Sequence, residues 1–220
     1  MTEVLLVGGS PAHVSEDLLH ELIENAEYVC AVDSGADQLF DIGHAPNLFC
    51  GDADSLSQKG ITTIGILAAQ EYIDAEVYEE DKDATDLELA LQAIKKRVPD
   101  ARITACNMLG GRTDHELAVI GCLANCGMPV MIQEEDCLAN IMLEDEEWGL
   151  LDMEGMGFSF IPLEHNSVVT LEGMKWDLDH KVCHTLSDLG ISNIIEKDQT
   201  LVTCNGGSII AFTYENPKEK

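Results

Sequence analysis

The order of strand-like and helix-like segments along this 220-residue chain constrains its fold most. Up to about residue 135, short apolar and β-branched runs alternate with helical patterns. Beyond that point the helical pattern stops, and short alternating runs follow one another between Gly, Asn and Asp residues. Strands that alternate with helices predict a mostly parallel sheet with helices on both faces, and the later pattern is typical of a small antiparallel β-sandwich. We therefore expect a Rossmann-like three-layer α/β domain at residues 1–135 and a β-sandwich at residues 136–220.

The same patterns locate the individual segments. In the first domain we expect helices near residues 15–24 and 36–42, and further helices that begin at Thr85 and Thr113. The strands expected there are EVLLVGG, YVCAVD, NLFCGD, ITTIGIL, AEVYEED, RITACNML and PVMIQ. The strands expected in the second domain are FSFIPLE, SVVTLEG, KWDLD, TLVTCNGG and SIIAFTYE.

The chain is strongly acidic. Its 41 Asp and Glu residues against 12 Lys and Arg give a formal net charge of −29. Such a surface repels phosphates, so the composition argues against nucleic-acid binding through a basic surface and favours cations, metals or acid-tolerant partners. Adaptation to high salt would produce the same excess, and most of these charges belong to a solvated face in either case.

Neither a membrane nor an oxidising compartment is indicated. The sequence contains no apolar run of about 18 residues, the length of a transmembrane helix, and residues 1–9 lack the basic start and cleavage site of a secretory signal. We expect a cytoplasmic protein without a membrane partner. The eight Cys form no Cys-x-x-Cys pair, which favours reduced core thiols over disulfides or zinc ligands.

One hexapeptide motif occurs twice in nearly the same form, as TDLELA from Thr85 and as TDHELA from Thr113. Thr followed three residues later by Glu is a capping box, in which both side chains bind backbone N–H groups that a helix start leaves unpaired. Capping does not require the Asp that follows each Thr, although an acid in the first turn also gains from the helix dipole. Asp86 and Asp114 therefore have either a purely structural role at the helix starts or an additional functional role.

Acidic residues follow four of the expected strands, in the loops VDSGAD, GDADS, EEDKDATD and LGGRTDH. Because ligands bind at the carboxyl ends of the strands in an open parallel sheet, these loops are expected to converge on one edge. Crowded carboxylates repel one another unless a cation lies among them, and oxygen ligands in an exposed crevice suit Mg²⁺. We therefore expect a Mg²⁺ site at this edge, with Asp52 and Asp54 in a turn after one strand and Asp86 and Asp114 at two helix starts.

The same edge carries residues that suit phosphate. Arg112 follows a Gly pair and is one of three Arg in the chain. Its planar fork of donors fits a phosphate group, and the helix start beside it adds N–H donors. A salt bridge to a neighbouring Asp is the structural alternative for Arg112. Lys82, which lies between two Asp, is a second candidate cation, with local pairing as its alternative.

Six motifs carry a resemblance. VDSGAD, GDADS, KDATDLELA, GGRTDH, GMKWDL and GISN occur in the order and approximate spacing found in thiamine pyrophosphokinases. The match extends from the second expected strand almost to the C-terminus, across both expected domains. The chain therefore resembles the thiamine pyrophosphokinase family.

The resemblance implies a two-domain homodimer in which thiamine lies between subunits. It implies transfer of pyrophosphate from Mg-ATP to the hydroxyl of thiamine, which yields thiamine diphosphate and AMP. The catalytic residues it implies are Asp52, Asp54, Asp86, Arg112 and Asp114, the first three as Mg²⁺ ligands. It places Asp33, Lys82, Asp83, Arg112 and His115 on the ATP side, and Ser192 and Asn193 on the thiamine side.

Some residues have competing interpretations. Trp176 matches the family's KW, yet we expect it to anchor the core of the sandwich rather than to stack on substrate. Asn193 has an ordinary turn residue as its alternative. The family usually reads DGGAN where this chain reads DSGAD, so Ser34 and Asp37 depart from it, and Ser replaces a residue that tolerates positive φ.

Two other function classes remain open at this point. A metal-dependent phosphohydrolase would use the same acids and Arg112 to cleave a phosphate ester with water. A non-catalytic module that binds thiamine or divalent cations would need the acids alone and would have little use for Arg112 in the metal loop.

Overall fold

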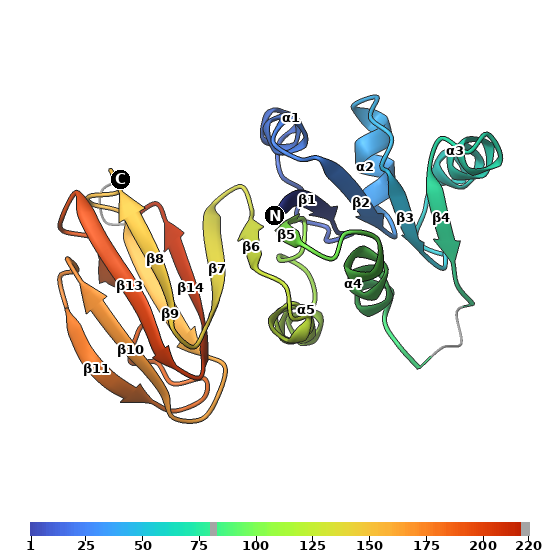
Figure 1. Cartoon of the computed structure of the whole chain (residues 1–220). Helices are drawn as coiled ribbons and strands as arrows, with labels where there is room; N and C mark the ends of the chain where they lie inside the picture. The colour runs from blue at the N-terminus through green and yellow to red at the C-terminus, as the bar shows by residue number, and fades with distance from the viewer. Residues whose placement is uncertain (80–82, 217–220) are drawn as a thin grey trace. The chain divides into compact units, whose positions relative to one another are not determined.

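The computed structural model describes residues 1–79 and 83–216. The chain divides into two compact units, Met1–Glu135 and Asp136–Lys220 (Figure 1).

The first unit is built on a parallel sheet. Its strands lie in the order β6-β5-β1-β2-β3-β4, and every pair in this run is parallel. They are β1 (Thr2–Val7), β2 (Tyr28–Val32), β3 (Leu48–Gly51), β4 (Asp74–Val77), β5 (Ala101–Cys106) and β6 (Val130–Gln133). The chain steps away from β1 in one direction as far as β4 and then continues on the other side with β5. The order therefore reverses between β1 and β5, where open α/β sheets bind ligands.

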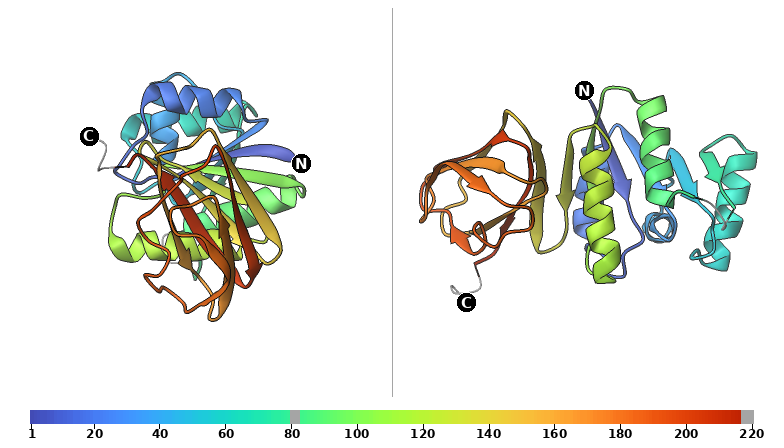
Figure 2. Two further views of the ribbon diagram at one scale, coloured as in Figure 1. Left: turned by 90° about the vertical axis from the view of Figure 1, so that its left-hand side faces the viewer. Right: turned by 90° about the horizontal axis from the view of Figure 1, so that it is seen from below.

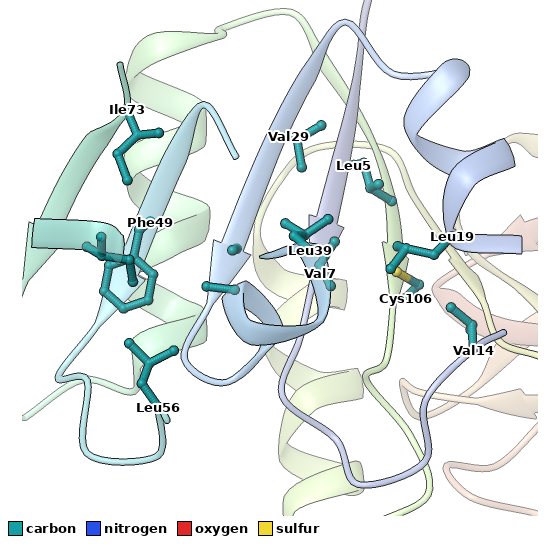
Figure 3. Packing of buried hydrophobic residues seen from close by; sticks show 13 residues of the cluster. Leu5, Val7, Val14, Leu19, Val29, Leu39, Phe49, Leu56, Ile73 and Cys106 are labelled. Atoms are coloured by element: carbon teal, nitrogen blue, oxygen red, sulfur yellow. The ribbon is translucent and has the colours of Figure 1, made fainter. Parts of the chain in front are cut away.

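Helices cover both faces of this sheet. They are α1 (Glu16–Glu24), α2 (Gly35–Asp41), α3 (Gln58–Ala69), α4 (Asp86–Arg97) and α5 (Thr113–Asn125). Figure 1 shows α1, α2 and α3 over one face and α4 and α5 over the other. On the first of these faces, Leu19, Leu39 and Phe49 belong to one buried cluster that joins the helices to the sheet (Figure 3). The α/β class predicted from the sequence is confirmed.

One predicted strand is wrong. ITTIGIL, read as a strand because it is rich in β-branched residues, lies within α3. Ser57 caps this helix by accepting a hydrogen bond from the N–H of Gly60 at 2.9 Å, and Ile64 is buried in the core. A parallel connection from β3 to β4 requires a crossover, which α3 supplies, so tertiary structure overrides a modest local preference.

The second unit is an antiparallel sandwich. One layer runs β12-β9-β14-β7 and the other β11-β10-β13-β8. Figure 2 shows the strands of this unit, coloured yellow to red, stacked in layers. The strands are β7 (Cys137–Leu143), β8 (Glu146–Leu151), β9 (Gly157–Pro162), β10 (Ser167–Glu172), β11 (Leu178–Cys183), β12 (Asn193–Ile194), β13 (Gln199–Gly206) and β14 (Ser208–Tyr214). Phe158 and Phe160 of one layer share a buried cluster with Val169 and Leu171 of the other. This packing confirms the predicted sandwich, although β7, β8 and β12 were not among the expected strands.

Two further expectations concern the whole chain. Across the described residues, we find no helix with the length and apolar character needed to span a membrane. All eight Cys are free, and five of them are buried, as expected of reduced core thiols.

The repeated hexapeptide motif lies at the start of two helices, which are capped in different ways. Thr85 caps α4 by accepting a hydrogen bond from the N–H of Glu88 at 3.2 Å, as predicted. The prediction for Thr113 is wrong, because Arg112 is the cap residue of α5 and makes no side-chain cap bond. Glu116 instead accepts hydrogen bonds from the N–H groups of Gly110 and Gly111, which lie before the helix.

The two Thr residues are therefore expected to respond differently to substitution. Thr85→Ala removes a side-chain cap and should lower the free energy of unfolding by about 1 kcal/mol. Thr113→Ala should change it by less than about 0.5 kcal/mol, because the hydroxyl is not the cap of α5. Urea denaturation of both variants measures the difference. Equal losses would contradict the assignment of the two caps.

Candidate functional site

A crevice of about 1460 Å³ lies at the carboxyl edge of the sheet in the first unit. The loops that follow β1 and β5 line it, together with residues of α4 and α5. It therefore includes the point where the strand order reverses between β1 and β5. Of the residues predicted for the site, Asp33, Asp52, Asp86, Arg112 and His115 line this crevice.

Three carboxylates meet at one end of the crevice. Asp33 follows β2, Asp52 follows β3, and Asp86 is the first residue of α4. One carboxylate oxygen from each lies within 4.8 Å of the others, and all three side chains are half-buried. The acids that the sequence distributes over distant segments are thus brought together by the convergence of the loops.

The backbone around these acids is shaped to bring them close. Asp33 has a φ of 51°, a left-handed conformation that is uncommon outside Gly and that Asp tolerates better than most residues. A Cβ atom on Gly51 would lie 2.2 Å from Oδ1 of Asp33. A larger residue at position 51 would therefore force the Asp33 carboxylate to move from its place beside the end of β3.

The three acids fit a divalent cation. Each offers a hard oxygen ligand, and carboxylates at this spacing repel one another when no positive charge lies between them. Mg²⁺ is commonly held in proteins by a few carboxylates, while water and substrate phosphates complete its shell. The donor set therefore suits Mg²⁺ better than metals that prefer sulfur or nitrogen.

Asp54 and Asp83, two other predicted acids, are not among these three carboxylates. Asp54 is exposed, and its N–H donates a hydrogen bond to Oδ1 of Asp52 at 3.1 Å. Asp83 is exposed as well. Lys82 lies outside the described residues. The structure thus adds Asp33 to the candidate metal ligands, while the metal role of Asp54 stays a prediction.

Arg112 is paired with Asp114 on the crevice wall. Its Nε and Nη2 donate to the two carboxylate oxygens of Asp114, at 3.1 and 2.6 Å. Both side chains are well exposed, at 70% and 66% of their surface. The salt bridge considered as the alternative for Arg112 is therefore present. The hydrogen bond from Arg112 lowers the pKa of Asp114 to about 2.

This pair predicts a measurable change on ligand binding. Asp114 should titrate with a pKa near 2 in the free protein, so the pair is fully charged at neutral pH and is lost only as the pH falls from about 4 through about 2. If a phosphate draws Arg112 away, the pKa of Asp114 should rise toward its ordinary value. Carbon-detected NMR of the Asp114 carboxyl with and without ATP measures this shift. An unchanged pKa in the ATP complex would show that Arg112 stays on Asp114.

A buried carboxylate that the sequence analysis missed holds the loop before Arg112. Glu134, only 6% exposed, accepts hydrogen bonds from the N–H groups of Asn107, Met108 and Leu109 at 3.0, 2.7 and 3.0 Å. It follows β6 directly. Within the acidic run QEED, nothing in the sequence distinguishes this Glu from its solvated neighbours.

Asn107 lines the crevice and joins three segments of the chain. Its Oδ1 accepts from the N–H of Val14 at 2.7 Å, and its Nδ2 donates to Gln38 of α2. Its φ of 55° turns the chain at the end of β5. The loops after β1 and β5 are thereby fixed to each other before any ligand binds.

The structure accounts for both departures from the family's DGGAN. Ser34 has a φ of −63°, so no residue that tolerates positive φ is needed there, and the positive φ lies at Asp33. The carboxylate of Asp37 accepts from the N–H and the hydroxyl of Ser57 at 2.7 and 2.6 Å. Asp37 thus anchors α3 at the end of the loop that contains Asp52.

The residues predicted for the thiamine side lie in the second unit. Asn193 is buried, and its side chain binds the backbone of Trp176 through both Oδ1 and Nδ2, at 3.1 and 2.9 Å. Trp176 itself is 54% exposed, so the prediction that it anchors the sandwich core is wrong. Nζ of Lys175 lies 4.9 Å from the centre of its ring. Ser192 is exposed, and its N–H donates to the hydroxyl of Ser159 at 3.0 Å.

Comparison with known families decides the identity. Residues 19–132 match the family described as thiamin pyrophosphokinase, catalytic domain, and residues 140–209 match thiamin pyrophosphokinase, vitamin B1 binding domain. The chain belongs to the thiamine pyrophosphokinase family. The resemblance seen in the sequence motifs is thereby confirmed, and the protein is an enzyme of the transferase class.

Individual thiamine pyrophosphokinases agree along most of the chain. The Bacillus subtilis enzyme is 33% identical over 199 residues, which cover 88% of this chain and 89% of that protein. Its crystal structure matches with a TM-score of 0.80 over 97% of this chain and 99% of the other, at 26% identity. The Candida albicans enzyme matches with a TM-score of 0.81 over 97% and 90% of the two chains, at 15% identity, and so shows the shared fold.

Proposed function

We propose that this thiamine pyrophosphokinase uses Mg-ATP as its donor and releases AMP. The hydroxyl oxygen of thiamine attacks the β-phosphorus and forms the new O–P bond. The bond between that phosphorus and the oxygen bridging to the α-phosphorus breaks, AMP leaves with the electron pair, and the hydroxyl proton is lost to solvent. The observation that carries the proposal is the approach of Asp33, Asp52 and Asp86 to one another beside Arg112 in a single crevice.

The three acids are proposed to hold Mg²⁺. The ion would neutralise charge on the phosphate oxygens, which is the main requirement of phosphoryl transfer. Asp33 and Asp52 are placed by the ends of two neighbouring strands, and Asp86 by the capped start of α4. Rigid supports of this kind keep the carboxylates in position without a large rearrangement on binding.

Arg112 is proposed to bind a phosphate, with Asp114 as its partner in the free enzyme. The guanidinium is exposed to the crevice and presents donors in a planar fork. His115 lines the same wall and is within the segment proposed for the ATP side. Positioning and charge neutralisation account for the reaction without a protein nucleophile.

The thiamine side is proposed to involve Ser192 and Asn193 and a second copy of the chain. The side chain of Asn193 holds the backbone of Trp176, and the indole ring of Trp176 is exposed. An exposed aromatic ring on a fixed backbone supports a role for this region in binding thiamine. A homodimer would complete the site. Light scattering at working concentration measures the oligomeric state, and a monomer would contradict this part of the proposal.

An AMP-release assay tests the reaction. Purified protein is incubated with ATP and Mg²⁺, with and without thiamine, and the products are identified by mass. AMP that appears only with thiamine, together with a product heavier by one pyrophosphate, is the expected result. Consumption of ATP without thiamine would identify a hydrolase, and thiamine binding without turnover would identify a binding module.

A further inference from the structure

The backbone N–H groups of Gly110 and Gly111 share one acceptor. Oε1 of Glu116 accepts from both, at 2.8 and 2.9 Å. The two N–H groups lie just before the first residue of α5, where the helix dipole favours an anion. Gly110 has a φ of 91°, which turns its peptide so that successive N–H groups face the same side. A single carboxylate oxygen therefore occupies a backbone anion-binding position.

The neighbouring donor is occupied in the same way. Arg112 gives two hydrogen bonds to Asp114, at 3.1 and 2.6 Å. Both groups of donors that suit a phosphate in this loop, the Gly110–Gly111 N–H pair and the guanidinium, therefore hold carboxylates of the chain itself.

Glu116 differs from the other carboxylate that binds this loop. Glu134 is buried and accepts hydrogen bonds from the backbone N–H groups of residues 107–109. Glu116 is half-buried and lines the crevice. A ligand in the crevice can take over the hydrogen bonds of Glu116, whereas those of Glu134 belong to the support of the loop.

We propose that Glu116 determines nucleotide affinity by competing with a phosphate of ATP for the N–H groups of Gly110 and Gly111. This inference rests on the proposed function. On binding, a phosphate oxygen replaces Oε1 of Glu116 as the acceptor, and the Glu116 side chain turns to solvent.

Two substitutions weaken the hydrogen bonds of the Glu116 carboxylate in different ways. Glu116→Gln removes the charge and weakens the acceptor, while Glu116→Asp keeps the charge but shortens the side chain by one methylene. Glu88→Gln is the matched control, because Glu88 also lines the crevice and its carboxylate accepts from Gln92 of its own helix rather than from the loop. Isothermal titration calorimetry measures the Kd of ATP with Mg²⁺ and without thiamine, and circular dichroism checks that each variant is folded.

We expect both Glu116 variants to bind ATP about tenfold more tightly than the wild type. Glu88→Gln should change the Kd by less than about twofold, since an exposed charge is screened by salt. Unchanged or weaker binding by the folded Glu116 variants would overturn the inference and leave Glu116 as a cap of α5. An equal gain in Glu88→Gln would overturn it too, because a general charge effect would then suffice. Failure of the wild type to bind ATP would instead reject the proposed function itself.

Discussion

Replacement of Asp52 by Asn is expected to slow turnover at least about 100-fold at saturating ATP and thiamine. Substitution of a residue that only hydrogen-bonds to a metal ligand lowers metal affinity or activity about 10- to 100-fold, and the loss of a ligand itself should cost at least as much. Asn keeps the shape of the side chain but removes one of the three negative charges that lie within 4.8 Å of one another. The loss should appear in kcat and in the Mg²⁺ concentration that gives half-maximal rate. Steady-state rates over a range of Mg²⁺ concentrations measure both quantities.

Two further Asp substitutions accompany this experiment, one as a control and one as a test of Asp54. Asp41→Asn removes an exposed acid of α2 that pairs with Lys59 at 3.1 Å, and it should leave the rate unchanged. Asp54→Asn tests the metal role predicted for Asp54, which lies outside the group of three. Wild-type Mg²⁺ dependence in Asp52→Asn would reject the assignment of the metal site. The same result in Asp54→Asn would remove only Asp54 from the candidate metal ligands.

Glu134→Gln is expected to lower the free energy of unfolding by about 2–3 kcal/mol, the scale of hydrogen bonds to a charged group. The buried carboxylate accepts three backbone N–H groups, and Gln supplies a single acceptor oxygen and places an NH₂ group where a second acceptor is needed. Since the loop leads to Arg112, the Kd of ATP should rise as well. Urea denaturation gives the stability, and calorimetry gives the affinity.

The next residue supplies a control for this experiment. Glu135 is exposed and accepts from the N–H of Ser15 at 2.7 Å. Glu135→Gln removes the same charge from the same segment and should cost less than about 1 kcal/mol. If the two variants were equally stable, Glu134 would not be the support of the loop that its hydrogen bonds indicate.

The predictable part of this molecule is the part that depends on periodicity and topology. Alternation of strands and helices gives the parallel sheet, and the rule that ligands bind at the carboxyl ends of strands brings Asp33, Asp52 and Asp86 to one edge. The Thr85 cap follows from a local pattern, because its hydrogen bond joins residues three apart. Each of these features rests on short-range order or on the geometry of a whole sheet.

The features that were missed depend on long-range contacts, on the turn of one short loop and on how the sandwich core is filled. Glu134 reaches the loop at 107–109 across 25 or more positions, and no local pattern encodes that distance. Glu116, rather than Thr113, binds the backbone at the start of α5 because the Gly pair before it turns its N–H groups toward the side chain. Trp176 is exposed because the core of the sandwich is filled by other residues, which include Phe158 and Phe160.

The reversal of strand order between β1 and β5 has a mechanical consequence. Asp33 and Asp52 extend from strands on one side of β1, and Arg112 extends from the loop after β5 on the other side. Without a ligand, the two sides are joined at this edge by backbone hydrogen bonds such as those from Gly8 to Cys106 and from Ser10 to Asn107, each 2.9 Å long. A nucleotide bound by residues from both sides would act as a removable cross-link. The strands on either side of the reversal could then separate only after the nucleotide is released. Hydrogen exchange in β1, β2 and β5 would then slow together on binding, and the substrate itself would make the domain unfold as one cooperative unit.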